Sequence, residues 1–331
     1  MQDTDARELL LEVRNLTIRF RDDDGWTDVV RDIGFSIRAG ETAALVGESG
    51  CGKSVTALSL ARLIPSPPVS YPSGSIRFRG VDTLTMTPRD LHTLRGRGIS
   101  YVFQDPATAL NPVFRIGFQM AELLDGDRQQ RRMRATALLD HVGLPSPAAC
   151  LDAYPHELSG GMQQRVVIAM AIAHQPGLLV ADEPTTALDV TIQAQILTLL
   201  KRLQREFGMA VLLITHNLGL VADVAHRVHV MYAGSLVESG DAGTVLTRPA
   251  HPYTRGLLSV VPRLERTAGR LAGIPGTVPA AGSLPPGCPF APRCPRADSL
   301  CRVAMPADSP VDGNPSHHVR CVHPLNPGTA I

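Results

Sequence analysis

A glycine-rich segment early in the chain has the residue types needed to bind a phosphate chain. It fits the pattern G-x-x-x-x-G-K-[ST] and reads Gly47-Glu48-Ser49-Gly50-Cys51-Gly52-Lys53-Ser54. Glycines let the backbone wrap closely around phosphates, so that successive N–H groups point inward. Lys53 would place a cation between the β- and γ-phosphates, and the Ser54 hydroxyl would bind Mg²⁺. An apolar stretch precedes the segment and a helical one follows it, which is the context that this chemistry requires.

Two acidic residues follow an apolar stretch later in the chain. Residues 178–181 read Leu-Leu-Val-Ala, which predicts a buried strand, and Asp182 and Glu183 come directly after it. In open α/β sheets, ligands bind at the carboxyl ends of the strands. We therefore expect Asp182 to hold Mg²⁺ through its water shell and Glu183 to accept a proton from an attacking water. Two such acids alone would also suit a helix cap, and the glycine-rich segment upstream favours the catalytic interpretation.

A second phosphate-binding element is predicted at the start of another helix. Residues 158–165 read Leu-Ser-Gly-Gly-Met-Gln-Gln-Arg. Ser159 and the two glycines suit a helix start that binds an anion. One nucleotide needs only one glycine-rich loop, so the second element would serve a nucleotide held by another subunit. The alternative interpretation is an ordinary capped helix.

The chain resembles the ATP-binding subunits of ABC transporters over about residues 8–262. Residues 47–54 match the Walker A segment of that family, and residues 158–165 match its signature. Asp182 matches the Walker B aspartate, and Glu183 matches the catalytic glutamate. The resemblance implies an α/β fold with a P-loop NTPase (RecA-like) ABC ATPase core and a helical subdomain at about residues 105–165.

Three further landmarks of the family occur in order. Gln104 matches the Q-loop glutamine, Asp189 of Ala187-Leu188-Asp189 matches the D-loop, and His216 matches the switch histidine. The resemblance implies that Glu183, His216 and Gln104 are catalytic and that Ser54, Gln104 and Asp182 hold Mg²⁺. In this interpretation Gln104 also senses the transmembrane partner, and His216 holds the γ-phosphate.

The resemblance also implies a head-to-tail dimer with two ATP molecules between the subunits, each touching one Walker A segment and the opposite signature. The adenine would stack on Phe20, with Trp26 as the alternative. The implied nucleotide-binding residues are Phe20, Gly47, Ser49, Gly50, Cys51, Gly52, Lys53, Ser54, Val55, Gln104, Ser159, Gly160, Gly161, Gln164, Asp189 and His216.

Hydrophobic patterning places these residues on alternating strands and helices. Strands are expected at 10–20, 29–37, 42–46, 76–78, 99–103, 178–181 and 210–215, and helices at 55–64, about 120–144, 162–174 and 190–207. This alternation predicts a mostly parallel sheet covered on both faces. Four prolines in residues 65–74 predict a loop, and the basic run at 128–134 predicts a solvated helix face. We expect an ATPase domain at 1–255 and a C-terminal extension at 256–331.

Composition excludes several classes of protein. The chain has 331 residues, of which 44% are apolar and 19% are charged, with a formal net charge of +1. This balance gives no sign of a nucleic-acid binder or of a disordered chain. No apolar run approaches the ~20 residues that cross a bilayer, and the polar start suggests no secretory signal. We expect a peripheral protein at the cytoplasmic face of the cell (inner) membrane, held there by permease subunits.

The last 44 residues concentrate the cysteines. Cys288, Cys294, Cys301 and Cys321 are separated by five, six and nineteen residues, and eleven of the 27 prolines lie in 279–331. So many prolines are not expected inside helices or a sheet, which predicts a loop-rich module without a hydrophobic core. A set of four thiolates suits zinc or a [4Fe–4S] cluster, and the absence of C-x₂-C spacing mildly favours the cluster. Cysteines without a metal, as free thiols or disulfides, remain the third alternative.

The tail resembles the C-terminal extension of oligopeptide/dipeptide ABC importer ATPases, a family that also serves nickel and other small solutes. The resemblance lies in segments such as His251-Pro252-Tyr253-Thr254-Arg255-Gly256 and Gly287-Cys288-Pro289-Phe290. The resemblance implies short peptides as cargo and a [4Fe–4S] cluster on the four cysteines. His317, His318 and His323 lie close to Cys321 in sequence, and we expect them at the surface rather than as ligands.

The resemblance implies several partners. These are a second ABC ATPase, with a heterodimer favoured over a homodimer, two transmembrane permease subunits and, indirectly, an extracytoplasmic substrate-binding protein; no nucleic acid is expected. A groove in the helical subdomain would receive a coupling helix of a permease. The alternatives are an importer ATPase for nickel or another small solute, a soluble ABC protein and an iron–sulfur redox sensor. One motif of each kind and no heptad run argue against the soluble ABC protein.

Overall fold

The computed structural model describes residues 7–23, 25–185, 189–260 and 273–325. The chain divides into two compact units, which we describe separately. The first is built around Thr87–Leu212 and is called the helical unit. The second, called the sheet unit, combines Glu8–Met86 with Leu213–Ile331. No helix among the described residues is long and apolar enough to cross a membrane.

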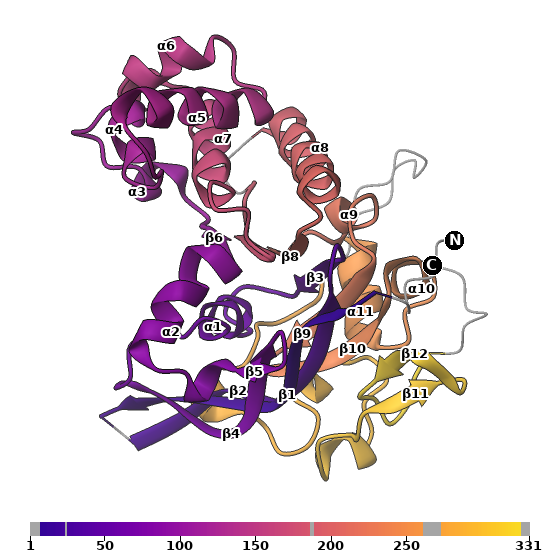
Figure 1. The fold of residues 1–331 in the computed structure, drawn as a ribbon. Helices are drawn as coiled ribbons and strands as arrows, with labels where there is room; N and C mark the ends of the chain where they lie inside the picture. The colour runs from indigo at the N-terminus through magenta and orange to yellow at the C-terminus, as the bar shows by residue number, and fades with distance from the viewer. Residues whose placement is uncertain (1–6, 24, 186–188, 261–272, 326–331) are drawn as a thin grey trace. The chain divides into compact units, whose positions relative to one another are not determined.

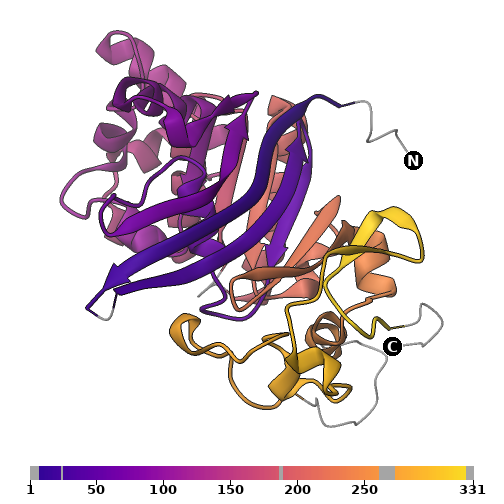
Figure 2. The ribbon, with the colours of Figure 1, turned by 90° about the horizontal axis from the view of Figure 1, so that it is seen from below.

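The sheet unit begins with an antiparallel sheet. Its strands are β1 (Leu9–Asp22), β2 (Gly25–Arg38), β4 (Val69–Phe78) and β5 (Val81–Asp82), in the order β2-β1-β4-β5. The long ribbons of β1 and β2 run side by side in Figure 2, with Ile18 opposite Val30. Both residues are fully buried, so the alternation of apolar and polar residues along each strand directs one face inward.

Strand β4 corrects the expectation of a loop at residues 65–74. The strand runs through Pro72, and its pairing with β1 is irregular between Ser70 and Ser73. On the other side, β5 pairs only with Arg77 and Phe78. Pro72 therefore lies at an irregular edge of the sheet, where a missing N–H breaks no ladder hydrogen bond.

A second set of strands in the sheet unit carries the glycine-rich segment. β3 (Thr42–Val46) pairs in parallel with β9 (Arg227–Tyr232), and β10 (Ser235–Asp241) pairs antiparallel to β9. β12 (Asn314–Val319) continues antiparallel to β10, and β11 (Ser309–Val311) pairs with β12. The helices of this unit are α1 (Lys53–Ser59), α9 (Leu218–Val221), α10 (Ala242–Thr247) and α11 (Pro252–Ser259).

The tail differs from the loop-rich, coreless module that the prolines predicted. Pro310 and Pro315 lie within β11 and β12, which pair only partially with their neighbours and therefore tolerate a missing N–H. Phe290 is 2% exposed and packs against Tyr232 and Tyr253, with ring centroids 5.2 and 5.3 Å away. The tail therefore shares the hydrophobic core of the sheet unit.

Two short strands and most of the helices form the helical unit. β6 (Ile99–Val102) and β7 (Leu178–Asp182) pair in parallel, and β8 (Ala210–Thr215) leads from this unit into the sheet unit. The main helices are α2 (Pro88–Thr93), α3 (Pro106–Ala109), α4 (Ile116–Ala121), α5 (Arg128–His141), α6 (Pro147–Asp152), α7 (Gly160–Ala171) and α8 (Val190–Phe207). Figure 1 shows α4, α5 and α6 packed together, as their contacts confirm.

The single helical pattern expected at about 120–144 is divided in the structure. α4 ends at Ala121 and α5 begins after Asp127. The Asp127 side chain accepts a hydrogen bond from the Gln130 backbone N–H, and the Gln130 side chain accepts one from the Asp127 backbone N–H. Gly126 precedes this capping box with a positive φ of 116°. A left-handed glycine followed by a capping box starts a new helix, although the hydrophobic period alone shows no break.

Candidate nucleotide-binding site

The glycine-rich segment forms a tight loop between β3 and α1 in the sheet unit. Gly50 and Gly52 have φ values of 78° and 105°, which L side chains rarely adopt. A Cβ atom on Gly47 would lie 2.2 Å from the carbonyl oxygen of Met231, so a side chain is excluded there. Ser49, Gly50 and Ser54 are exposed, whereas the rest of the loop is partly or fully buried.

Lys53 is held by the loop itself. Its Nζ donates hydrogen bonds to the carbonyl oxygens of Gly47 and Glu48, at 2.8 and 3.0 Å, and the residue is 5% exposed. The Cys51 thiol lies 3.9 Å from the same Nζ, and burial raises the pKa of this thiol. These carbonyl oxygens fix the position of the buried Lys53 ammonium inside the loop. A cation held there suits the binding of a phosphate chain.

Two predicted residues of the helical unit come together. Gln104 follows β6, Glu183 follows β7, and the Gln104 amide donates a hydrogen bond of 3.4 Å to a Glu183 carboxylate oxygen. The parallel pairing of β6 with β7 explains this proximity, because parallel strands end at the same edge. Glu183 has a φ of 46°, an unfavourable backbone conformation for a residue with a side chain. Asp182 ends β7 and is half-buried.

The signature residues lie at the start of α7. The Ser159 hydroxyl accepts a hydrogen bond from the Met162 backbone at 3.4 Å, and Ser159 and Gly160 are exposed. A Cβ on Gly161 would approach Ile192 of α8 to 3.0 Å, so a side chain there would force α7 and α8 apart or move Ile192. Gln164, one turn further along, is fully buried with no hydrogen-bond partner for its amide among the described residues.

The other predicted nucleotide contacts lie at element boundaries. Asp189 begins α8, where its carboxylate accepts a hydrogen bond from the Ile192 backbone at 2.9 Å, while Ala187 and Leu188 lie outside the described residues. His216 is exposed directly after β8. Phe20 is half-buried on β1, and Trp26 is 45% exposed on β2 with the Arg19 guanidinium 4.7 Å from its ring.

The four tail cysteines gather in the sheet unit, and none forms a disulfide. Burial raises the pKa of Cys321 to about 11, with a further contribution from the thiols of Cys288, Cys294 and Cys301. The Cys288 backbone also donates a hydrogen bond of 2.8 Å to the carbonyl of Cys301. Asp298, Cys301 and His323 have possible ligand atoms that all lie within 4.8 Å of one another.

One of the three histidines near Cys321, His317, differs from the surface position expected for it. His317 is 3% exposed and lies 2.7 Å from a carboxylate oxygen of Glu238, which is itself buried. Glu238 also accepts backbone hydrogen bonds from Ala250 and His251. This buried network joins β12 to β10 and α11, and only the three-dimensional structure identifies it, because Glu238 has no motif. His318 and His323 pair with acidic residues near the surface.

Comparisons with known proteins agree with this geometry. The ABC transporter family profile matches residues 30–186, and the profile of the oligopeptide/dipeptide transporter C-terminal region matches residues 237–301. The dimeric ATP-binding cassette MJ0796 in a post-hydrolysis state bound to ADP and phosphate superposes with a TM-score of 0.62. The two chains are 26% identical, and the match covers 70% of this chain and 99% of that one.

Two curated relatives match over nearly their whole length. The dipeptide transport ATP-binding protein DppD of Escherichia coli is 47% identical over 322 residues, covering 96% of this chain and 97% of the relative. The oligopeptide transport ATP-binding protein OppD of Salmonella typhimurium is 48% identical over 305 residues, covering 91% and 90%. The chain belongs to the ABC transporter ATPases. Within that family it is an ATP-binding subunit of the dipeptide/oligopeptide import type.

Proposed function

We propose that this protein is the motor subunit that couples ATP binding and hydrolysis to the uptake of short peptides through separate permease subunits. The observation that carries this proposal is the presence, in one chain, of a complete phosphate-binding loop and the oligopeptide/dipeptide-type tail. We assign the ATPase domain to residues 1–255 and the extension to 256–331.

Hydrolysis would use residues from several of the family's motifs. The hydroxyl of Ser54, the amide oxygen of Gln104 and the carboxylate of Asp182 are hard oxygen donors, which fit Mg²⁺. Bound Mg²⁺ supplies charge neutralisation for the phosphates. Glu183 accepts the proton of the attacking water, and His216 contacts the γ-phosphate and orients that water. Gln104 reaches Glu183 in this structure and therefore suits a residue that reports the state of the site.

The nucleotide would be shared between two subunits. Lys53 and the loop backbone hold the phosphates, Phe20 stacks on the adenine, and the exposed Ser159 and Gly160 bind the nucleotide of the second ATPase subunit. The dimeric state of the MJ0796 cassette supports this arrangement. We favour a heterodimer, at the cytoplasmic face of the membrane. The burial of Gln164 makes the start of α7, rather than Gln164, the candidate contact surface.

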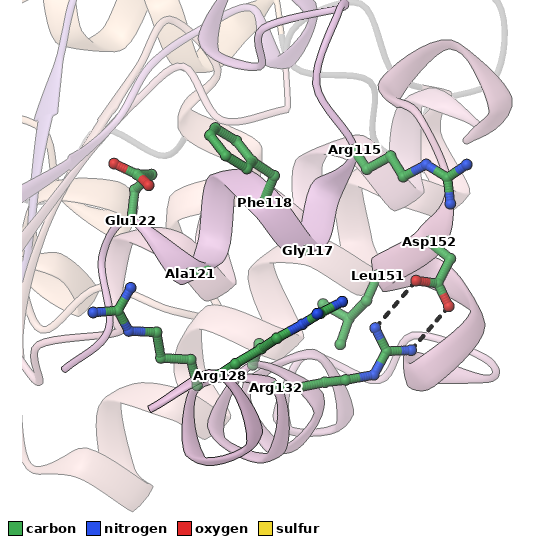
Figure 3. Close-up of a pocket in the computed structure, with 11 residues that line it drawn as sticks. Arg115, Gly117, Phe118, Ala121, Glu122, Arg128, Arg132, Leu151 and Asp152 are labelled. Atoms are coloured by element: carbon green, nitrogen blue, oxygen red, sulfur yellow. Dashed lines mark hydrogen bonds and ion pairs between the residues drawn. The ribbon is translucent and has the colours of Figure 1, made fainter. Parts of the chain in front are cut away.

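A permease would dock on the helical unit. A pocket of about 480 Å³ lies between α4, α5 and α6, and Figure 3 shows Phe118, Arg115 and Arg128 around it. Arg132 forms two hydrogen bonds with Asp152 at its edge, at 2.8 and 3.1 Å. The basic run of α5 thus lines a pocket rather than only facing solvent. Phe118 is 52% exposed and stacks on Phe114, so an apolar and acidic segment fits this surface.

The four cysteines would hold a [4Fe–4S] cluster, with zinc as the alternative. The donor set fits, because the thiols form no disulfide, lie close enough to influence each other's pKa and are buried or half-buried. Burial raises the pKa of Cys288, Cys294 and Cys321, so these thiols resist ionisation unless a metal stabilises the thiolates. A bound cluster supplies cross-links for the tail, and we assign it a structural role.

Purification and transport together test the proposal. The protein expressed with its neighbouring genes should co-purify in mild detergent with two permeases and a second ATPase. Reconstituted into vesicles with internal ATP, that complex should move a labelled dipeptide. Co-purification with ribosomes or DNA instead, or transport of nickel but of no peptide, would contradict the proposal.

A further inference from the structure

Glu48 is the second residue of the phosphate-binding loop, and distant parts of the chain hold it in place. Its backbone N–H donates to the hydroxyl of Tyr253 at 2.9 Å. Its carbonyl oxygen accepts from Lys53 Nζ at 3.0 Å. Its two carboxylate oxygens accept from Arg293, at 2.5 and 3.0 Å. Two of these partners, Tyr253 and Arg293, follow the nucleotide-binding motifs in the chain, and all of them lie within the sheet unit.

Arg293 is itself rigidly held. Its guanidinium also donates to the carbonyl oxygens of Pro275 and Ile274, at 2.8 and 3.3 Å, and to the Tyr232 hydroxyl at 3.4 Å. The Arg293 side chain is 6% exposed, against 29% for Glu48. A planar guanidinium with each nitrogen engaged loses little freedom on pairing, so this ion pair is stronger than a pair of mobile surface side chains.

The charge of Glu48 explains why the loop needs this partner. A free carboxylate beside a cradle for a triphosphate repels the ligand, and the repulsion is strong where water is partly excluded. Arg293 neutralises the carboxylate, while the carbonyl oxygen of the same residue accepts a hydrogen bond from the Lys53 ammonium. The pair therefore has an electrostatic effect as well as a geometric one.

We propose that Arg293 is a positioning residue for the nucleotide loop, through which the cysteine-containing tail sets the affinity for ATP. This inference goes beyond the proposed function, because it gives the tail a role in the ATPase itself. It does not require that a metal be bound.

A double-mutant cycle on the purified subunit tests the proposal, with ATP affinity measured by titration of a fluorescent ATP analogue and by KM. Arg293→Gln should raise both the dissociation constant from the titration and KM about 10-fold, as expected for loss of a charge-assisted pair. It should change kcat much less. In the Glu48→Gln background the same substitution should have little effect, because no carboxylate remains to neutralise. Arg302→Gln is the matched control, since Arg302 is exposed and adjoins Cys301 as Arg293 adjoins Cys294.

Two results would overturn the proposal. One is an unchanged ATP affinity in Arg293→Gln. The other is a loss of affinity that Glu48→Gln fails to relieve, which would mean that the substitution acts by disrupting the tail. If Arg293→Gln does not fold, Arg293→Lys keeps the charge without the two-pronged geometry, and it should weaken ATP binding by a smaller factor that Glu48→Gln also removes.

Discussion

The amide of Gln104 lies 3.4 Å from the carboxylate of Glu183 and donates a hydrogen bond to it. The two side chains follow neighbouring parallel strands, so the backbone of the helical unit sets their separation. The residue that would sense the transmembrane partner therefore contacts the proposed catalytic base directly. Movement of Gln104 would therefore change the surroundings of that carboxylate.

Glu183→Gln should leave ATP binding intact and reduce turnover at least about 100-fold, because the attacking water loses its proton acceptor. The amide keeps the size of the side chain and can still pair with Gln104. Turnover is measured as phosphate release, and binding as retention of labelled ATP. Glu206→Gln, at an exposed position near the C-terminal end of α8, serves as the control and should retain wild-type turnover. Hydrolysis by Glu183→Gln at the wild-type rate would show that another group is the base.

Phe118→Asp should weaken co-purification with the permease subunits and lower the ATPase activity of the complex, since it replaces an apolar contact by a negative charge where an apolar and acidic segment would dock. Hydrolysis by the isolated subunit should not change, because Phe118 is 52% exposed and supports no core. Met133→Asp is a matched control, being 59% exposed on α5 but not part of the pocket lining. Equal retention of permeases by both variants would place the docking surface elsewhere.

Anaerobically purified protein should contain iron and sulfide in equal amounts and absorb broadly in the visible range. Cys321→Ser should lose this absorption and lower the melting temperature of the protein, since one ligand of four is removed. Cys150→Ser controls for the loss of a thiol, because Cys150 lies in α6 of the helical unit. A colourless protein with stoichiometric zinc would assign the site to zinc.

Two buried histidines should make the fold sensitive to acid. Burial lowers the pKa of His229 to about 3 and that of His251 to about 4. Both are neutral in the folded protein, whereas in the unfolded chain they take up protons below about pH 6.5. The unfolded state then binds more protons, so stability is fully present above pH 6.5 and falls on acidification toward pH 4, by about 1.4 kcal/mol per pH unit for each histidine.

Urea unfolding at pH 7, 5.5 and 4.5 measures this dependence. His229→Phe should reduce the slope of unfolding free energy against pH by the equivalent of about one proton. The neighbouring Phe35 ring offers the new phenylalanine an aromatic contact. His92→Gln, at an exposed position of α2, should leave the slope unchanged. A slope that is the same in His229→Phe and in the wild-type protein would mean that His229 is protonated in the folded state.

Local pattern was enough to predict the elements that carry the site. Strands at 42–46 and 210–215 and the helix at 190–207 have the bounds expected from runs of apolar residues and from helical periodicity. Only the end of strand β4, at 76–78, was predicted, because the effect of a proline depends on what lies beside it. Pro72 is tolerated only because its neighbour β5 is two residues long, and such a fact about tertiary structure leaves no local signal.

The contacts that complete the site were less accessible to sequence reasoning. The motif shows that residue 48 lies in a phosphate-binding loop, but the second position of the motif, which residue 48 occupies, accepts any residue. Its partner, Arg293, lies in a proline-rich stretch whose sequence pattern gives no sign of a pair with Glu48. Contacts across so long a separation in sequence are not predictable from local pattern. They are identified only in the fold, which brings Tyr253 and Arg293 to the loop.

The separation between Glu48 and Arg293 also has a consequence for biosynthesis. The two residues are 245 positions apart. At about 5–20 residues per second, a ribosome needs about 10–50 seconds to add the second after the first. Throughout that interval the nascent chain carries an uncompensated carboxylate in its phosphate loop. The proposed role of Arg293 therefore implies that tight binding of ATP waits until residue 293 has been made, and that chains released before that point would bind ATP less tightly.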